Sequence, residues 1–295
     1  MNTSGVVVGV DGSASALAAV RWAAEEARST GEPLTLVHAY SPGGQSYAAR
    51  ELRAVQQREQ GTAHLREAEV VASLAAPGVR VASRLRAGDV RKVLLAESSG
   101  ARQAVLGSRG AHSVSRLLLG SAGLALAMKA LCPVVVVRDR APATGPVVVG
   151  LNGWPECAPA ARFAFLWAAA HGAPVTALRV WRALGTTNSA GVHERARAAL
   201  AAELAPIAGE FPQVPVEHLV LRGPAGETLL QFGEHARLLV VGARGHTGFA
   251  RLLLGSTSTH VAGQAASPVA VIRSAEVVRH WREGARLDPA ADGAG

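Results

Sequence analysis

Short runs of β-branched residues alternate with longer stretches of helical periodicity in the first half of the chain. The apolar runs predict strands at residues 6–10, 34–40, 79–86, 103–106 and 134–137. The stretches between them predict helices at residues 14–29, 45–76, 90–98 and 121–131. Strands that alternate with helices predict an α/β domain, with a parallel sheet covered by helices on both faces.

The same pattern returns in the second half. Residues 105–138 match residues 240–273 at a constant offset of 135, and both contain RLLLGS. The opening VVVGVDGS at 6–13 matches VVVGLNGW at 147–154. A repeat of about 140 residues is a whole domain rather than a solenoid unit. We therefore predict two tandem doubly wound domains, here called the N-terminal and C-terminal repeats, at residues 1–140 and 146–274.

The last residues, 275–295, fall outside the duplication and form a C-terminal tail. Val277, Val278 and Trp281 have the spacing of one short helical face, which we expect to dock on the protein. Beyond Asp288 the tail consists mostly of Pro, Ala and Gly, and we expect it to be mobile.

A glycine pattern, G-x-x-G-x9-G-S, follows a predicted strand and ends at a predicted helix in each repeat. Its members are Gly107, Gly110, Gly120 and Ser121, and then Gly242, Gly245, Gly255 and Ser256. Glycine lets a phosphate approach the backbone closely, and a helix N-terminus offers N–H groups and the positive end of its dipole. A tight turn with an ordinary helix cap would use the same residues, so both interpretations stay open. The pattern lacks the GK[ST] of a Walker A loop.

Asp11 stands at the carboxyl end of the first predicted strand. Its carboxylate can accept a hydrogen bond from a ribose hydroxyl or hold a metal ion, and it can equally form a turn or cap the next helix. His38, His112, His246 and His260 lie in separate segments without metal-ligand spacing, so we interpret them as structural or surface residues. No catalytic and no metal-binding residue is assigned.

Composition narrows the class of protein. Hydrophobic residues make up 49% and charged residues 18%, which argues against disorder. Aromatics are only 4%, so the core must be mainly Ala, Val and Leu. The net charge of +8 comes from scattered Arg residues, often beside Glu, and predicts no nucleic-acid partner. Cys132 and Cys157 show no metal spacing and are expected to fill small apolar spaces. We find no signal peptide and no membrane span, and expect a cytoplasmic protein.

The opening VVVGVDGS, the glycine pattern and the closing PVVVVR together resemble the universal stress protein family, and the duplication resembles its tandem members. The resemblance implies a five-stranded parallel, Rossmann-like sheet of order 3-2-1-4-5 in each repeat. It also implies that the repeats pair about a pseudo-two-fold axis, often through their last strands. The ATP-binding branch of the family carries the glycine pattern intact, which implies ATP, with or without Mg²⁺, as the ligand.

The same resemblance implies roles for individual residues. Asp11 is similar to the acidic group near the ribose, and Ala39 to the position whose backbone contacts adenine. The loop and phosphate positions of the N-terminal repeat are Gly107, Gly110, Gly120, Ser121 and Ala122. The matching positions of the C-terminal repeat are Val180, Gly242, Gly245, Gly255, Ser256 and Thr257, with Ser258 as an extra hydroxyl donor. Arg109 and Arg244 are equivalent loop residues that either steady phosphates or are solvated.

Two departures from the family pattern concern the sites. Asn152 stands where the first-strand Asp is expected, and Trp154-Pro155 replaces small residues. The N-terminal repeat has Ala122 where the C-terminal repeat has Thr257. We therefore predict that both sites bind an adenine nucleotide with unequal affinity.

At the level of function, these observations favour a nucleotide-dependent regulator of a stress response, acting through a protein partner or as a homodimer. The alternatives are a slow ATP hydrolase and a ligand-free interaction module whose glycines serve packing only.

Overall fold

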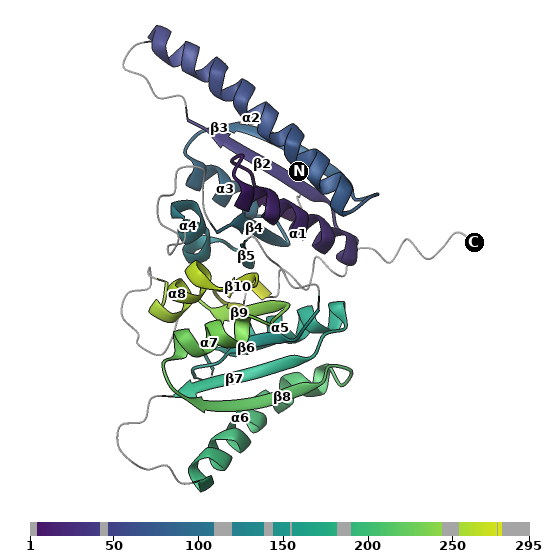
Figure 1. The fold of residues 1–295 in the computed structure, drawn as a ribbon, viewed down its shortest axis with the longest axis vertical. Coiled ribbons are helices and arrows are strands. Elements are labelled where there is room, and N and C mark those ends of the chain that lie inside the picture. The colour runs from purple at the N-terminus through teal and green to yellow at the C-terminus, as the bar shows by residue number, and fades with distance from the viewer. Residues whose placement is uncertain are drawn as a thin grey trace, which may run out of the picture.

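The computed structural model describes residues 5–41, 47–108, 120–138, 144–153, 155–181, 190–243, 254–275 and 277–278. Strands and helices alternate throughout, as the hydrophobic pattern predicts (Figure 1). The elements of the N-terminal repeat are β1 (Val6–Gly9), α1 (Ala14–Thr30), β2 (Leu34–Tyr40), α2 (Tyr47–Ala75), β3 (Val81–Ala87), α3 (Val90–Ser98), β4 (Gln103–Gly107), α4 (Ser121–Lys129) and β5 (Val134–Val137).

The C-terminal repeat has the same order of elements. They are β6 (Val147–Gly150), α5 (Ala158–His171), β7 (Val175–Trp181), α6 (Ala190–Glu210), β8 (Val216–Arg222), α7 (Ala225–Gly233), β9 (Leu238–Gly242), α8 (Ser256–Gln264) and β10 (Val269–Ile272). The predicted strands at 34–40 and 134–137 and the predicted helix at 90–98 have the observed bounds, and the other elements of the N-terminal repeat begin or end within two residues of their prediction.

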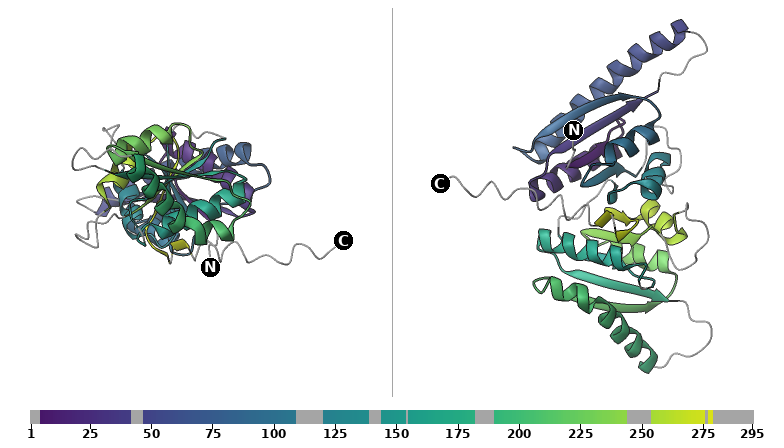
Figure 2. Two further views of the ribbon diagram at one scale, coloured as in Figure 1. Left: turned by 90° about the horizontal axis from the view of Figure 1, so that it is seen from below. Right: turned by 180° about the vertical axis from the view of Figure 1, so that it is seen from behind.

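All strands join one ten-stranded sheet of order β3-β2-β1-β4-β5-β10-β9-β6-β7-β8. Within each repeat neighbouring strands are parallel, which confirms two α/β units of order 3-2-1-4-5. The repeats meet where β5 pairs antiparallel with β10. The views in Figure 2 show the strands of both repeats running through the molecule with helices on either side.

The register at the junction relates the repeats as a two-fold axis would. Val135 lies opposite Ala270, which is its own equivalent at the offset of 135. Val134 pairs with Val271 and Val136 with Val269, so each strand presents the same positions to the other. This isologous pairing agrees with the pseudo-two-fold relationship that the family resemblance implies.

The core continues across this junction. On one face of the sheet a single apolar cluster includes residues of α1, α2, α5 and α6, and Val278 of the tail belongs to it at 2% exposure. Val277 is buried as well, as the predicted docking of the tail requires, whereas Trp281 and the residues beyond Asp288 lie outside the described residues. Cys132 and Cys157 are free and buried, and burial raises the pKa of the Cys132 thiol to about 12.

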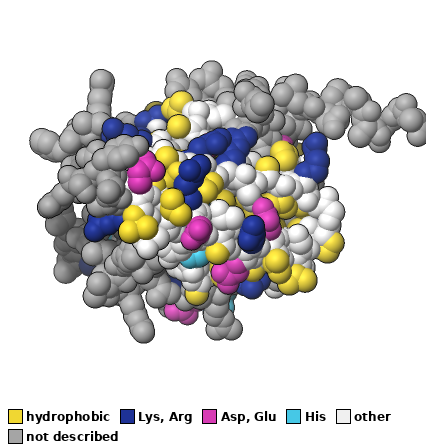
Figure 3. Space-filling view, turned by 90° about the horizontal axis from the view of Figure 1, so that it is seen from above, with side chains coloured by type: hydrophobic (Ala, Val, Ile, Leu, Met, Phe, Trp, Pro, Cys, Tyr) yellow, Lys and Arg dark blue, Asp and Glu magenta, His cyan; other side chains and the backbone are white. Residues whose placement is uncertain are grey.

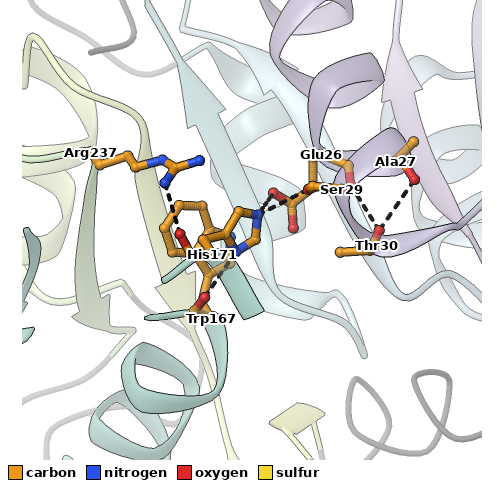
Figure 4. Close-up of polar contacts among 7 residues, drawn as sticks. All are labelled: Glu26, Ala27, Ser29, Thr30, Trp167, His171 and Arg237. Carbon is orange, nitrogen blue, oxygen red and sulfur yellow. Dashed lines mark hydrogen bonds and ion pairs between the residues drawn. The ribbon is translucent and has the colours of Figure 1, made fainter. Parts of the chain in front are cut away.

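A polar contact also crosses between the repeats, from α1 to the end of α5 (Figure 4). Glu26 Oε2 lies 2.9 Å from His171 Nε2, and both side chains are 3% exposed. His171 Nδ1 donates to the Trp167 carbonyl at 2.8 Å, and the two rings stack with centroids 3.7 Å apart. The Arg237 guanidinium also lies over the Trp167 ring, 5.3 Å from the ring centroid. This buried group of polar contacts therefore links α1 of the N-terminal repeat to α5 of the C-terminal repeat.

Candidate functional site

The predicted site residues converge at the carboxyl ends of the strands. β1, β2 and β4 are neighbours, as are β6, β7 and β9, so the loops after them meet at one edge of each half of the sheet. Asp11 and Ala39 lie there in the N-terminal repeat, and Asn152 and Val180 in the C-terminal repeat. The crevice beyond the strand ends, at the switch in strand order, is where doubly wound sheets bind ligands.

A cavity of about 260 Å³ occupies this position in the C-terminal repeat. Its apolar wall is formed by Leu178, Val180, Leu229 and Val241. Its polar part is formed by residues that were predicted from the sequence to bind the ligand. They are Asn152, Gly242, Gly255, Ser256, Thr257 and Ser258. An apolar wall with a few polar groups at one side is the usual composition of a small-ligand site, and the volume lies near the lower end of the range for such sites, about 300 Å³.

The helices that follow the glycine pattern begin without a side-chain cap, as do α5 and α7. Gly120 precedes α4 and Gly255 precedes α8, and no side chain caps either helix with a hydrogen bond. By contrast, Ser13 caps α1 and Asp89 caps α3 through their side chains. The N–H groups of the first turn of α8 therefore have no side-chain acceptor of this kind at the cavity, which is the arrangement that suits a bound anion.

The hydroxyl of Ser258 has a role within the fold. It donates to the carbonyl of Gly242, and Ser258 is 6% exposed. A hydroxyl has one proton, so this bond uses the donor that the sequence analysis reserved for phosphate. Ser256 and Thr257 remain the hydroxyl-bearing residues at the start of α8. In addition, the Gly255 N–H donates to the Ala243 carbonyl at 2.9 Å and closes the base of the glycine loop.

In the N-terminal repeat Asp11 shapes the turn between β1 and α1. Its Oδ1 accepts from the N–H of Ser13 at 3.0 Å and from the Ser13 hydroxyl at 2.6 Å. The Ser13 hydroxyl oxygen in turn accepts from the N–H of Ala16. The turn interpretation of Asp11 is therefore realised in the structure, whereas the cap of α1 is Ser13. Asp11 follows the end of β1, where the ribose site is predicted.

Gly107 has a packing role of its own. A Cβ added there would lie 2.6 Å from the backbone carbonyl carbon of Ser15 and 2.7 Å from its Oγ. Any side chain at this position would collide with the backbone at the start of α1. The glycine is thus needed for the close approach of β4 to α1, whether or not a ligand binds.

A pair of histidines that the sequence pattern did not predict lies at this edge. His38 of β2 donates from Nδ1 to the Val10 carbonyl at 2.8 Å, and its ring lies edge-to-face to that of His64 of α2, with centroids 5.4 Å apart. Burial lowers the pKa of His38, against the raising effect of the hydrogen bond to Val10. The position of His38 beside Ala39 was a signal for the first member of the pair, whereas nothing in the sequence around His64 points to the site.

The C-terminal repeat has a permanent ion pair in the corresponding place. Arg179 is the equivalent of His38, and its guanidinium lies 2.5 Å from the carboxylate of Glu203 on α6. The two repeats therefore differ in charge at the same edge of the sheet, as well as in Asp11 and Asn152. Unequal affinity of the two sites stays a prediction.

Some predicted site residues lie outside the described part of the chain. They are Arg109, Gly110, Arg244 and Gly245, together with His112, His246 and Trp154. His260 is described, and its Nδ1 lies 3.1 Å from the side-chain amide of Gln264. Within the described ranges there is no cluster of three His, Cys, Asp or Glu residues suited to a metal ion. The helices in those ranges are also too short or too polar to cross a membrane.

Comparison with known proteins gives matches over both repeats. The model of the universal stress protein family matches residues 4–138 and 144–273. A universal stress protein of Mycolicibacterium smegmatis is 37% identical over 91% of this chain and 97% of its own length.

A solved structure that covers most of this chain shows the same fold. The crystal structure of a universal stress protein from Archaeoglobus fulgidus covers 92% of this chain and 99% of its own, with a TM-score of 0.72 and 18% identity. A universal stress protein solved in complex with cAMP matches over its whole length, which covers 48% of this chain, at 29% identity and a TM-score of 0.36.

Proposed function

Because the chain belongs to the universal stress protein family, we propose that it is an ATP-binding regulator of a stress response. ATP binds at the carboxyl edge of each repeat, with its phosphates at the start of α4 or α8 and its base against the apolar wall. Binding changes the surface that a protein partner recognises. The cytoplasmic location belongs to the same proposal.

The cavity of the C-terminal repeat carries this proposal. It lies at the switch point of the sheet, and its polar side is the start of α8, where no side chain caps the helix. Apolar side chains from β7, β9 and α7 form the opposite wall. A nucleotide has a flat apolar base at one end and phosphates at the other. Its base suits the apolar wall, and its phosphates suit the start of α8.

Binding is favoured over fast hydrolysis by the chemistry of the lining. None of the described residues that line the cavity has a carboxylate or imidazole to act as a general base, and Asn152 stands at the position of Asp11. We therefore expect slow turnover at most. Fast, metal-dependent ATP hydrolysis that an Asp11→Ala variant abolishes would instead support an enzyme centred on the N-terminal repeat.

The first experiment is to denature the purified protein without added nucleotide and identify any released small molecule by chromatography and mass. We expect ATP, and titration calorimetry with ATP, with and without Mg²⁺, then gives the number of sites. If the protein neither releases nucleotide nor binds added ATP, the proposal is wrong and the interaction-module alternative gains support.

Two matched variants assign the sites. Val180→Trp fills the cavity of the C-terminal repeat, and Ala39→Trp makes the same change at the equivalent position of the N-terminal repeat. We expect each to remove the binding at its own repeat and to leave the other. Circular dichroism checks that both variants fold. Substitution at Gly107 is a poor test, because a Cβ there meets the backbone of Ser15.

A further inference from the structure

The long helix α2 exposes an apolar stripe. Four of the six large hydrophobic side chains that are exposed in the described part of the chain belong to it. They are Leu52 (63% exposed), Val55 (50%), Val70 (58%) and Leu74 (78%). α2 lies at the end of the molecule that Figure 3 views from above, where hydrophobic side chains are interspersed with charged ones.

These four residues share one face of the helix. At about 100° per residue, positions 52, 55, 70 and 74 fall within a narrow sector, and positions 59, 63 and 66 fall in the same sector between them. The opposite face carries Leu65, Ala68 and Ala72, which are buried against the sheet and α1. The stripe therefore points away from the core.

The duplication provides an internal comparison. At the offset of 135, the equivalents of Val70 and Leu74 are Ala205 and Gly209 of α6. The described residues of α6 include no exposed large hydrophobic side chain. Since the same fold forms without the stripe, the fold does not require it, and the stripe is specific to the N-terminal repeat.

Charges on the stripe are complementary to those of a second copy in one orientation. Glu59 and Arg66 lie on either side of Ala63, and all three are exposed. They are seven residues apart, about 10 Å along the axis, which is too far for an ion pair within the helix. In an antiparallel pair of α2 helices centred between Thr62 and Ala63, Glu59 faces the partner's Arg66, whereas a parallel pair places like charges together.

The same antiparallel register matches the apolar residues. Val55 then faces the partner's Val70, and Leu52 lies within one residue of the position opposite the partner's Leu74. Small Ala63 lies at the centre, where two helices approach most closely. From this self-complementary arrangement we propose that α2 is the interface of a homodimer, in which the α2 helices of two chains pack antiparallel about a two-fold axis. Polar residues at the centre of a helix pair fix its orientation and register.

The contact is narrow, so the dimer is weak. From Leu52 to Leu74 the stripe extends about 33 Å along the axis at 1.5 Å per residue. A single helix face of this length lies toward the lower end of the usual interface sizes, about 1,200 Å² in total. We expect a monomer–dimer equilibrium that depends on concentration, with dissociation in the micromolar range or weaker, at about 10⁻⁶ M or above.

Sedimentation velocity over a concentration series tests the proposal on the full chain. We expect the average mass to rise toward twice the chain mass. Leu74→Glu should keep the protein monomeric at the highest concentration, and the matched control Leu131→Glu, at another exposed leucine (50%), should dimerise like the wild type. Because Leu74 is 78% exposed, its substitution leaves the fold intact, which circular dichroism verifies. A wild type that stays monomeric throughout would overturn the proposal.

Charge reversal tests the orientation. Glu59→Arg or Arg66→Glu alone places like charges opposite each other and should weaken the dimer by tenfold or more. The double variant with both changes restores opposite charges and should recover the wild-type dissociation constant. A dimer that persists unchanged in the single variants and in Leu74→Glu would show that another surface forms it, and would sink the assignment to α2.

Discussion

Several side chains at the carboxyl edge of the sheet serve the fold before any ligand arrives. Ser258 donates to the Gly242 carbonyl, Asp11 accepts from Ser13, and Gly107 leaves room for the backbone of Ser15. His38 belongs to the same group through its bond to the Val10 carbonyl. A residue at this edge can therefore stabilise the fold and also bind a ligand. Only a substitution that affects one of these two roles can distinguish them.

His38 gives a testable dependence of stability on pH. Burial lowers its pKa in the folded protein, while the neighbouring charges of His64 and Asp11 act in opposite directions. The folded protein thus keeps His38 neutral where the unfolded chain, with a histidine pKa of about 6.5, binds a proton. Neutral His38 therefore contributes fully to the free energy of unfolding above about pH 6.5. This contribution is lost as the pH falls toward the pKa of His38 in the folded protein, by at most about 1.4 kcal/mol per pH unit.

We expect His38→Gln to reduce this loss, because the amide can still donate to Val10 but does not titrate. Urea denaturation at about pH 7.5 and about pH 5.5 measures the difference. His235→Gln, at an exposed histidine, is the control and should behave like the wild type. An equal loss in wild type and His38→Gln would contradict the role of His38.

The first helices of the two repeats begin differently, and the sequence explains why. α1 starts directly after Ser13, whose side chain accepts from the Ala16 N–H, and it has 17 residues. α5 has 14 residues and starts at Ala158 after Cys157, which makes no side-chain capping bond. Pro155 and the turn after it, with the Ala158 N–H bonded to the Pro155 carbonyl, occupy the place of the first turn of α1. The departure from the family pattern thus delays the helix.

Ser13→Ala should therefore destabilise the protein by about 1 kcal/mol, the usual cost of losing a side-chain cap. The loss includes the hydrogen bond to Asp11, since the same hydroxyl serves both. Ser13→Thr keeps an oxygen at the cap and should recover most of the stability. Chemical denaturation compares the three proteins, and equal midpoints for Ala and wild type would contradict the capping role.

The repeats form one body rather than two linked domains. The β5–β10 pairing makes the sheet continuous, and a single apolar cluster runs beneath α1 and α5. The Glu26–His171 contact adds a buried polar link between the same helices. A change at one repeat can therefore reach the other through the β5–β10 pairing and the common apolar cluster, which is the route that the proposed regulatory function would use.

Glu26→Ala tests this link. It leaves the buried His171 ring without its carboxylate partner, and a buried polar group that loses a hydrogen-bond partner typically costs about 1–3 kcal/mol. Glu26→Gln keeps a hydrogen-bonding group and should cost less. Glu194→Ala removes the exposed ion pair with Arg197 and should not change stability measurably. If thermal unfolding of Glu26→Ala matches the wild type, the contact does not hold the repeats together.

Local pattern and tertiary structure determined different parts of this protein. The duplication, the alternation of strands and helices, and most element bounds follow from the sequence, because hydrophobic period and turn residues act over short distances. The glycine pattern likewise predicted the start of α8 as a ligand-binding position, and the start of α8 lines the cavity.

The sequence could not reveal the His38–His64 pair, the Glu26–His171 link or the packing role of Gly107. Each of them joins residues that only the folded chain brings together. The hydrogen bond from the Ser258 hydroxyl to the Gly242 carbonyl also depends on the tertiary structure. A buried donor needs an acceptor, and folding brings this carbonyl close to it.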